Sequence, residues 1–214
     1  MKKFDTVKKN LEGLGYKVSV FATANQAADY LDSNIDVKVV GFGGSVTLRD
    51  MGIWERLCRH NTVYDHMHGF PSDAEGEYLA PAQPNPANPG FREAALAQVY
   101  LTSANALVET GEIINIDSYG NRVGGSLFGH EKVYFVIGRN KLAPTYDEAI
   151  WRARNIAAPK NAQRKKLNTP CAAKADKCYN CRHPQRICRV LTVLWEAIEG
   201  ANIEVVLIDE DLGF

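Results

Sequence analysis

The chain has 214 residues, 45% of them hydrophobic, and its 25 lysine and arginine residues balance 25 aspartate and glutamate residues. This length and apolar content suit one globular domain with a small appendage. A formal net charge of zero removes the electrostatic footprint of a general nucleic-acid binder, and no apolar run is long enough to cross a membrane. We therefore expect no nucleic-acid partner and no membrane span.

Helical and extended patterns alternate along the chain. An amphipathic helix is predicted over 4–14, a strand over 16–21, a helix over 24–31 and a strand over 37–42. Further strands are predicted at 63–64, 99–101, 113–115, 133–137 and 203–208, the last after a helix that ends near Glu199. Strands separated by helices indicate βαβ units. We therefore expect an α/β fold with a mostly parallel sheet flanked by helices.

The patterns divide the chain into three predicted parts. These are an α/β core over 1–160, a cysteine-rich metal-binding segment with a helix over 161–200, and a C-terminal strand over 201–214 that returns to the core. Within the core, the stretch 71–89 carries five prolines and little apolar periodicity. A long segment of this kind is a lid, a binding loop or disordered chain, and we expect disorder.

A glycine-bearing loop follows the strand predicted over 37–42. Gly43 and Gly44 precede Ser45 and Thr47, and either hydroxyl can cap the helix that comes next. Backbone N–H groups at a helix start carry a partial positive charge, and glycine lets a phosphate or carboxylate approach closely. The loop is therefore a candidate anion site. A tight turn that binds nothing is the alternative.

A longer polar stretch runs over 102–123 beside apolar strand residues. It offers donors, acceptors and one fixed cation on Ser103, Asn105, Glu109, Asn121 and Arg122. This set suits the orientation of a carboxylate or phosphate through the guanidinium group. The alternative is a system of turns in which Asn121 satisfies backbone groups and Arg122 pairs with an acid.

Two further patterns are less specific. His66 and His68 form an H-x-H pair that could bind a metal. A basic run indicates either a solvated helix face or a docking patch for an acidic partner or anionic ligand. Its members are Arg152, Arg154, Lys160, Arg164, Lys165 and Lys166.

Four of the five cysteines form a C-x6-C-x2-C-x6-C array: Cys171, Cys178, Cys181 and Cys188. Two disulfides are one interpretation. The N-terminal sequence shows no apolar signal region, which favours a cytoplasmic protein, where thiols stay reduced. The array is therefore interpreted as a metal site.

Both zinc and a 4Fe-4S cluster accept four thiolates. Structural zinc sites usually pair two short knuckles, and only Cys178 and Cys181 make one here. Cys188 follows a proline-containing stretch, as in the cysteine runs of ferredoxins, although no ferredoxin spacing is matched. We favour the 4Fe-4S cluster, with zinc as the alternative, and His183 could replace one cysteine as a ligand.

Several runs together resemble the lactate-utilisation (LUD, formerly DUF162) domain family. They are 43–48, 102–106 with Glu109 and Gly111, 120–123, 138–141, 157–161 and the four-cysteine tail. The resemblance spans nearly the whole chain. It implies a fold similar to the sugar-isomerase and CoA-transferase-like group, a link to oxidation of lactate to pyruvate, and iron–sulfur or oxidoreductase partner subunits.

These observations leave three hypotheses open. The chain could be an iron–sulfur accessory or electron-transfer subunit that also binds a small anionic ligand. It could instead be a ligand-binding or assembly module with a structural zinc ion or cluster. The third hypothesis, an enzyme acting on a CoA ester or sugar phosphate, follows from fold analogy, with Glu109 or Glu112 as nucleophile or base.

Overall fold

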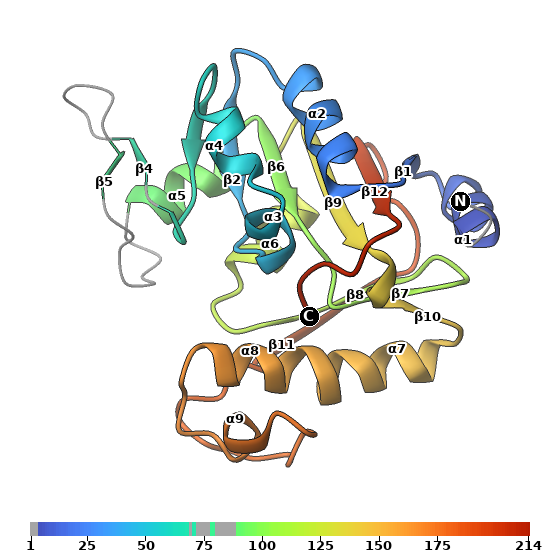
Figure 1. The fold of residues 1–214 in the computed structure, drawn as a ribbon, viewed down its shortest axis with the longest axis vertical. Helices are drawn as coiled ribbons and strands as arrows, with labels where there is room; N and C mark the ends of the chain where they lie inside the picture. Colours follow the sequence, from blue (N-terminus) through green and yellow to red (C-terminus); the bar gives the residue numbers. More distant parts are fainter. Residues whose placement is uncertain (1–3, 69, 72–77, 80–88) are drawn as a thin grey trace.

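The computed structural model describes residues 4–68, 70–71, 78–79 and 89–214. Its centre is a six-stranded sheet in the order β1-β12-β9-β6-β2-β3, in which every pair is parallel (Figure 1). The strands are β1 (Lys17–Phe21), β2 (Val39–Phe42), β3 (Thr62–Tyr64), β6 (Val99–Thr102), β9 (Lys132–Gly138) and β12 (Ile203–Ile208). The predicted α/β class with a mainly parallel sheet is confirmed.

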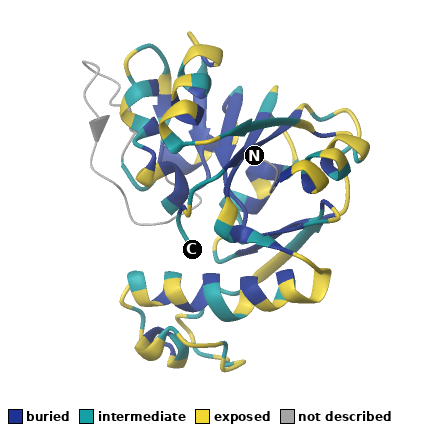
Figure 2. Cartoon of the chain, turned by 45° about the vertical axis from the view of Figure 1, so that its right-hand side comes forward, coloured by how far each residue is buried: buried dark blue, intermediate teal, exposed yellow. Residues whose placement is uncertain are grey.

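Both faces of this sheet are buried, and its central strands are mostly apolar. In β9, Tyr134 and Val136 belong to one hydrophobic core, whereas Val133 and Phe135 belong to the core on the opposite face. Alternate residues of a strand point to opposite faces, so one strand contributes to both cores. Figure 2 shows these strands buried beneath partly exposed helices.

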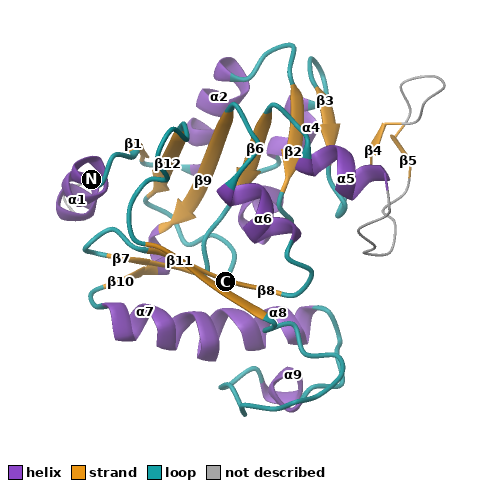
Figure 3. Cartoon of the chain, turned by 180° about the vertical axis from the view of Figure 1, so that it is seen from behind, coloured by secondary structure: helices purple, strands orange, loops and turns teal. Residues whose placement is uncertain are grey.

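Helices cover the two faces unequally. The first face packs against α2 (Ala24–Asn34), α3 (Val46–Asp50) and α4 (Ile53–Leu57). Thr23 starts α2 with a capping box, in which its side chain accepts from the Gln26 N–H. Seen from behind in Figure 3, the opposite face carries α1 (Asp5–Gly13), α5 (Pro89–Ala95), α6 (Asn121–Leu127) and a second sheet.

The second sheet has the order β10-β7-β8-β11 and is mixed. Its strands are β7 (Ala106–Val108), β8 (Ile113–Asp117), β10 (Leu142–Ala143) and β11 (Val190–Leu194). A long helix lies against it, built from α7 (Tyr146–Arg152), a π-helical turn η3 (Ala153–Ala157) and α8 (Ala158–Arg164) (Figure 1). The remaining elements are β4 (Phe70–Pro71), β5 (Tyr78–Leu79), the 3-10 turn η2 (Arg139–Lys141) and α9 (Pro170–Lys174).

The structure corrects one element of the sequence prediction. The predicted helix that ends near Glu199 is instead the strand β11, which pairs antiparallel with β8. Beyond it, β12 lies between β1 and β9 in the main sheet. The proline-rich stretch that was expected to be disordered lies largely outside the described residues.

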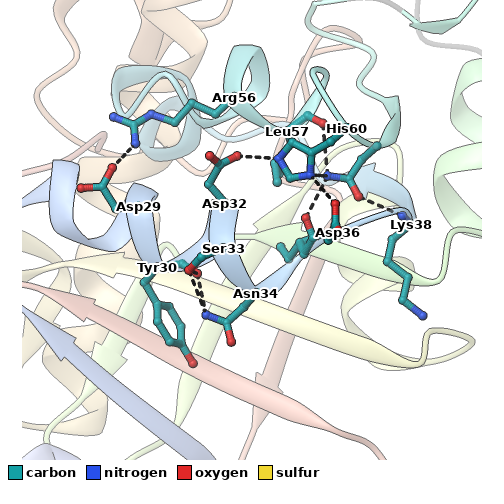
Figure 4. Close-up of polar contacts among 12 residues, drawn as sticks. Asp29, Tyr30, Asp32, Ser33, Asn34, Asp36, Lys38, Arg56, Leu57 and His60 are labelled. Carbon is teal, nitrogen blue, oxygen red and sulfur yellow. Dashed lines mark hydrogen bonds and ion pairs between the residues drawn. The ribbon is translucent and has the colours of Figure 1, made fainter.

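A surface network ties α2 to the loop that follows α4 (Figure 4). His60 lies between two carboxylates, with Nε2 at 2.9 Å from Asp32 and Nδ1 at 3.0 Å from Asp36. These contacts raise the pKa of His60, with Asp32 as the larger cause. Arg56 pairs with Asp29 in the same network.

Of the helices in the described part of the chain, none is both long enough and apolar enough to cross a membrane.

Candidate functional site

Three loops converge beyond the carboxyl ends of β2, β6 and β9. They carry Gly43–Ser45, which leads into α3, Ser103–Asn105 and the turn η2. Carboxyl ends of parallel strands meet at one edge, which is the usual ligand location in open α/β sheets. A cavity of about 380 Å³ lies here, bounded also by Arg122 at the start of α6 and by residues of α8.

The glycine loop lies too close to its neighbours for side chains. A Cβ atom on Gly43 would lie 2.9 Å from both Thr102 Oγ1 and Tyr100 OH. Gly44 has φ of +57°, and a Cβ atom there would lie 2.7 Å from Nε2 of His66. Ser45 begins α3, where its Oγ accepts from the Leu48 N–H at 3.3 Å. The predicted strand–glycine–helix arrangement is therefore present.

Arg122 is held by both its backbone and its side chain. Its N–H donates to Asp117 Oδ2 at 3.0 Å, so the carboxylate satisfies the start of α6. Its Nη2 donates to Asn105 Oδ1 at 3.1 Å and to the carbonyl of Ile116. Burial lowers the pKa of Arg122 from its usual value. The guanidinium group is thus fixed in the cavity wall before any ligand binds.

Lys141 is a second basic residue of the wall, and it is only 3% exposed. Its Nζ donates to Thr47 Oγ1 at 2.7 Å and to Ser103 Oγ at 2.8 Å. Burial lowers the pKa of Lys141 well below its usual value, and the charges of Arg152 and Arg122 lower it further. A buried amine with two hydroxyl partners and a cavity beside it is a candidate reactive group.

The cavity has a large excess of positive charge. Arg49, Arg122, Arg164 and Lys165 line it as cations, Lys141 is a fifth basic side chain, and Asp117 is the one acidic side chain in the lining formed by the described residues. Burial lowers the pKa of Lys165, and the neighbouring charge of Arg164 lowers it further. The cations therefore repel one another in a partly desolvated space. An anion would relieve this repulsion.

Most of the sequence-predicted ligand residues come together at this cavity. Those in the lining are Gly43, Gly44, Ser45, Ser103, Asn105, Asn121 and Arg122. Among the described residues, Thr47 and Glu109 are outside the lining. Thr47 lies behind it, bonded to Lys141. Glu109 lies in the turn between β7 and β8, where its N–H donates to the Ala143 carbonyl at 2.8 Å.

Other residues of the lining lie outside the two loops that were predicted to bind an anion. His66, of the H-x-H pair, lines the cavity, whereas His68 does not and instead contacts Asp65 at 2.6 Å. Arg164 and Lys165 belong to the basic run that was a candidate anion-docking patch. Arg152, from the same run, is buried rather than solvated and donates to the Asn140 carbonyl at 2.9 Å. Lys141 was named only within the run 138–141.

The four clustered cysteines line a second cavity, of about 210 Å³. All four are free thiols and half-buried. Hydrogen-bonding groups lie beside three of these sulfurs: Arg186 Nη2 is 3.3 Å from Cys188 Sγ, the backbone nitrogen of Asn180 is 3.3 Å from Cys178 Sγ, and Thr169 Oγ1 is 3.4 Å from Cys171 Sγ. Cys58 is separate, at the end of α4. Donors aimed at sulfur stabilise thiolates, the form that binds metal.

The donor set suits a metal group with four thiolates. Cys171, Cys178, Cys181 and Cys188 surround one cavity, and each thiolate of a 4Fe-4S cluster binds a different iron atom. Within the described residues, no three His, Cys, Asp or Glu side chains already form a group that could hold a metal ion. His183 is outside the lining given by the described residues; its Nδ1 accepts from the Gln185 N–H at 3.2 Å.

The two cavities adjoin. Ile116, in β8, and Ile187, next to Cys188, each line both of them. On the helix side, Ala157 lines the cationic cavity and Ala158 lines the cysteine cavity, at the junction of η3 and α8. π-Helical turns within α-helices frequently mark functional sites. Ile116 and Ile187 thus form an apolar wall that the two cavities share.

Comparisons with known proteins agree with this architecture. The structure is similar to the crystal structure of a DUF162 family protein from Deinococcus radiodurans, with a TM-score of 0.53 and 13% sequence identity over 97% of this chain and 96% of that one. No curated protein matched. The model of the LUD domain matches residues 4–208. The chain therefore belongs to the LUD domain family, which is associated with lactate utilisation.

Proposed function

We propose that this chain is an iron–sulfur accessory protein for electron transfer in lactate utilisation, and that it binds a small 2-hydroxy or 2-oxo carboxylate beside its cluster. The observation that carries this proposal is the shared wall. Ile116 and Ile187 separate a cationic cavity from a cavity lined by four cysteines. Neither cavity alone would favour a redox function over a binding function.

The charge of the first cavity supports a carboxylate ligand. Four cations and the basic residue Lys141 line it with one acid, and Arg122 offers the planar guanidinium group that suits carboxylates. A volume of about 380 Å³ is at the lower end of the range for small-molecule sites. Ser103 and Asn105 add donors and acceptors that can recognise the oxygen on the second carbon of the ligand.

The cysteine cavity supports the second part of the proposal. Cys171, Cys178, Cys181 and Cys188 would hold a 4Fe-4S cluster, which would supply one-electron redox chemistry at this position. Oxidation of a 2-hydroxy acid to a 2-oxo acid releases two electrons and two protons. We assign that oxidation to a partner oxidoreductase subunit, which makes this chain an accessory component.

A structural metal is the second candidate, and one observation favours it. Between α8 and β11, the described residues form a single regular element, the five-residue helix α9. A zinc ion or a redox-inactive cluster would stabilise this segment, because metal binding can supply folding free energy. The enzyme hypothesis gains less support, since neither Glu109 nor Glu112 is among the described residues that line either cavity.

Metal analysis separates the two candidates. The protein is purified without oxygen, and its iron, sulfide and zinc are measured with its visible spectrum before and after dithionite. About four irons and four sulfides per chain, with absorbance that bleaches on reduction, are expected. Cys178→Ser should lose the iron and Cys58→Ser, the matched control, should keep it. Stoichiometric zinc in a colourless protein would overturn the electron-transfer proposal.

A further inference from the structure

We infer that Lys141 is a nucleophilic amine, which forms an imine with the carbonyl carbon of a 2-oxo acid bound in the cationic cavity. This inference rests on the proposed function, because it assigns chemistry to the same ligand site. It goes beyond it by adding a covalent step and by choosing the 2-oxo acid over the 2-hydroxy acid as the reacting ligand.

The hydrogen bonds of Lys141 leave a lone pair for reaction. Nζ donates to Thr47 Oγ1 at 2.7 Å and to Ser103 Oγ at 2.8 Å. A neutral primary amine has two N–H bonds and one lone pair, so these two contacts account for both protons. Lys141 and Ser103 line the cavity, and Thr47 lies behind them. The two hydroxyls thus orient the amine and hold its protons while the lone pair stays free.

The surroundings favour the uncharged form of the amine. Lys141, Thr47 and Ser103 are 3%, 0% and 1% exposed. Burial lowers the pKa of Lys141 most, the charges of Arg152 and Arg122 lower it further, and that of Asp50 opposes them. Among the ion pairs of the described residues, none joins a carboxylate to Nζ. Lysines become nucleophiles when they are desolvated or placed beside other cations. Both conditions hold here.

The cavity also positions the ligand. The cations Arg122 and Lys165 line it and can hold the carboxylate of a 2-oxo acid. Its carbonyl carbon, one bond away from the carboxylate, would then lie near Lys141. A 2-hydroxy acid has no carbonyl carbon at that position and cannot react in this way, so the amine distinguishes product from substrate of the oxidation.

The chemical step balances without an oxidant or reductant. The Nζ lone pair attacks the carbonyl carbon and forms a C–N bond, and the carbonyl oxygen takes up a proton. The nitrogen then loses its protons while the C–O bond breaks and water leaves, which gives C=N. Ser103 Oγ lies at 2.8 Å from Nζ, within reach to pass a proton from nitrogen to the departing oxygen.

Reductive trapping tests the inference. The metal-loaded protein is incubated with pyruvate and sodium cyanoborohydride, and the modified residue is located by peptide mass spectrometry. Adduct at Lys141 should exceed that at the exposed Lys160 by at least about tenfold, because each unit of lowered pKa gives tenfold more neutral amine. Lactate should give none. Lys160→Arg is the matched control and should leave the adduct at position 141 unchanged.

Variants and a binding measurement complete the test. Lys141→Met should abolish the adduct, and Ser103→Ala, which keeps the amine, should slow its formation. Circular dichroism checks that both variants fold. Calorimetry without reductant measures pyruvate binding separately. Binding without an adduct at Lys141 would overturn the imine and leave the proposed function standing. An adduct at Lys141 in a protein with no reducible cluster would overturn the electron-transfer function and leave the imine standing.

Discussion

Lys141 and Thr47 are 94 residues apart in the chain and are joined by a hydrogen bond of 2.7 Å. One follows β9 and the other follows β2, so the parallel sheet brings them together at a single edge. The bond places an amine where water hardly reaches it. Its protonation is therefore coupled to the stability of the fold.

Unfolding measured against pH tests this coupling. The pKa of Lys141 is lowered in the folded state, so above that value the unfolded chain binds one more proton than the folded chain. Stability then rises with pH up to the usual lysine value near 10.4, by at most about 1.4 kcal/mol per pH unit. Lys141→Met should lose this contribution, and urea titrations of both proteins from pH 6 to 10 measure it. Parallel curves for the two proteins would mean that Lys141 titrates normally.

Replacement of Arg122 should weaken anion binding. Arg122→Met removes a cation fixed by Asn105 and Ile116, and a hydrogen bond to a charged group is worth about 1.5–3 kcal/mol, so the affinity for pyruvate should fall roughly tenfold to a hundredfold. Arg122→Lys should restore little, since an ammonium lacks the planar fork. Arg59→Met, on an exposed arginine, is the control. If calorimetry gave wild-type affinity for pyruvate in all three variants, Arg122 would not be part of the binding site.

The glycine loop offers a paired test of close packing. Gly44→Ala adds a Cβ atom 2.7 Å from His66 Nε2 at a φ of +57°, whereas Gly200→Ala adds one at φ of +76° with nothing within 4 Å. Gly200→Ala should cost about 1 kcal/mol from backbone strain alone. Gly44→Ala should cost more, up to about 3 kcal/mol, and should also weaken pyruvate binding by moving His66. Equal losses of stability in the two variants would show that the His66 side chain can move aside at no cost in free energy.

Strands buried on both faces could be predicted from the sequence because each is a short run of valine, isoleucine and aromatic residues. Of the mixed sheet, only β8 was predicted as a strand, at 113–115, whereas β7, β10 and β11 were not. In β11, Val190 and Leu191 are exposed, and the apolar residues at 190–198 resemble one helical face. β7 and β10 have three and two residues, too few to show any period.

Of the residues at the candidate site, likewise, some could be predicted from the sequence and others could not. Gly43, Ser45 and Arg122 belong to local patterns that indicate a turn or an anion. Lys141 has no such pattern, because a lysine after a strand is usually exposed. Its burial depends on loops after three different strands, which no short stretch of sequence encodes. Glu109 illustrates the reverse, since it lies within a polar stretch but the turn after β7 places it away from the cavity.

The reduction potential of the metal group, measured with and without pyruvate, is the most direct test of coupling between a redox cluster and the anion site. A potentiometric titration followed by electron paramagnetic resonance would measure it in the anaerobic protein and in Arg122→Met. Reduction adds negative charge, so an anion across the wall formed by Ile116 and Ile187 should lower the potential. Tenfold tighter binding to the oxidised form corresponds to about 59 mV. We expect a shift that Arg122→Met removes. A redox-inactive protein, or a potential that saturating pyruvate leaves unchanged, would show that no redox cluster is coupled to the anion site.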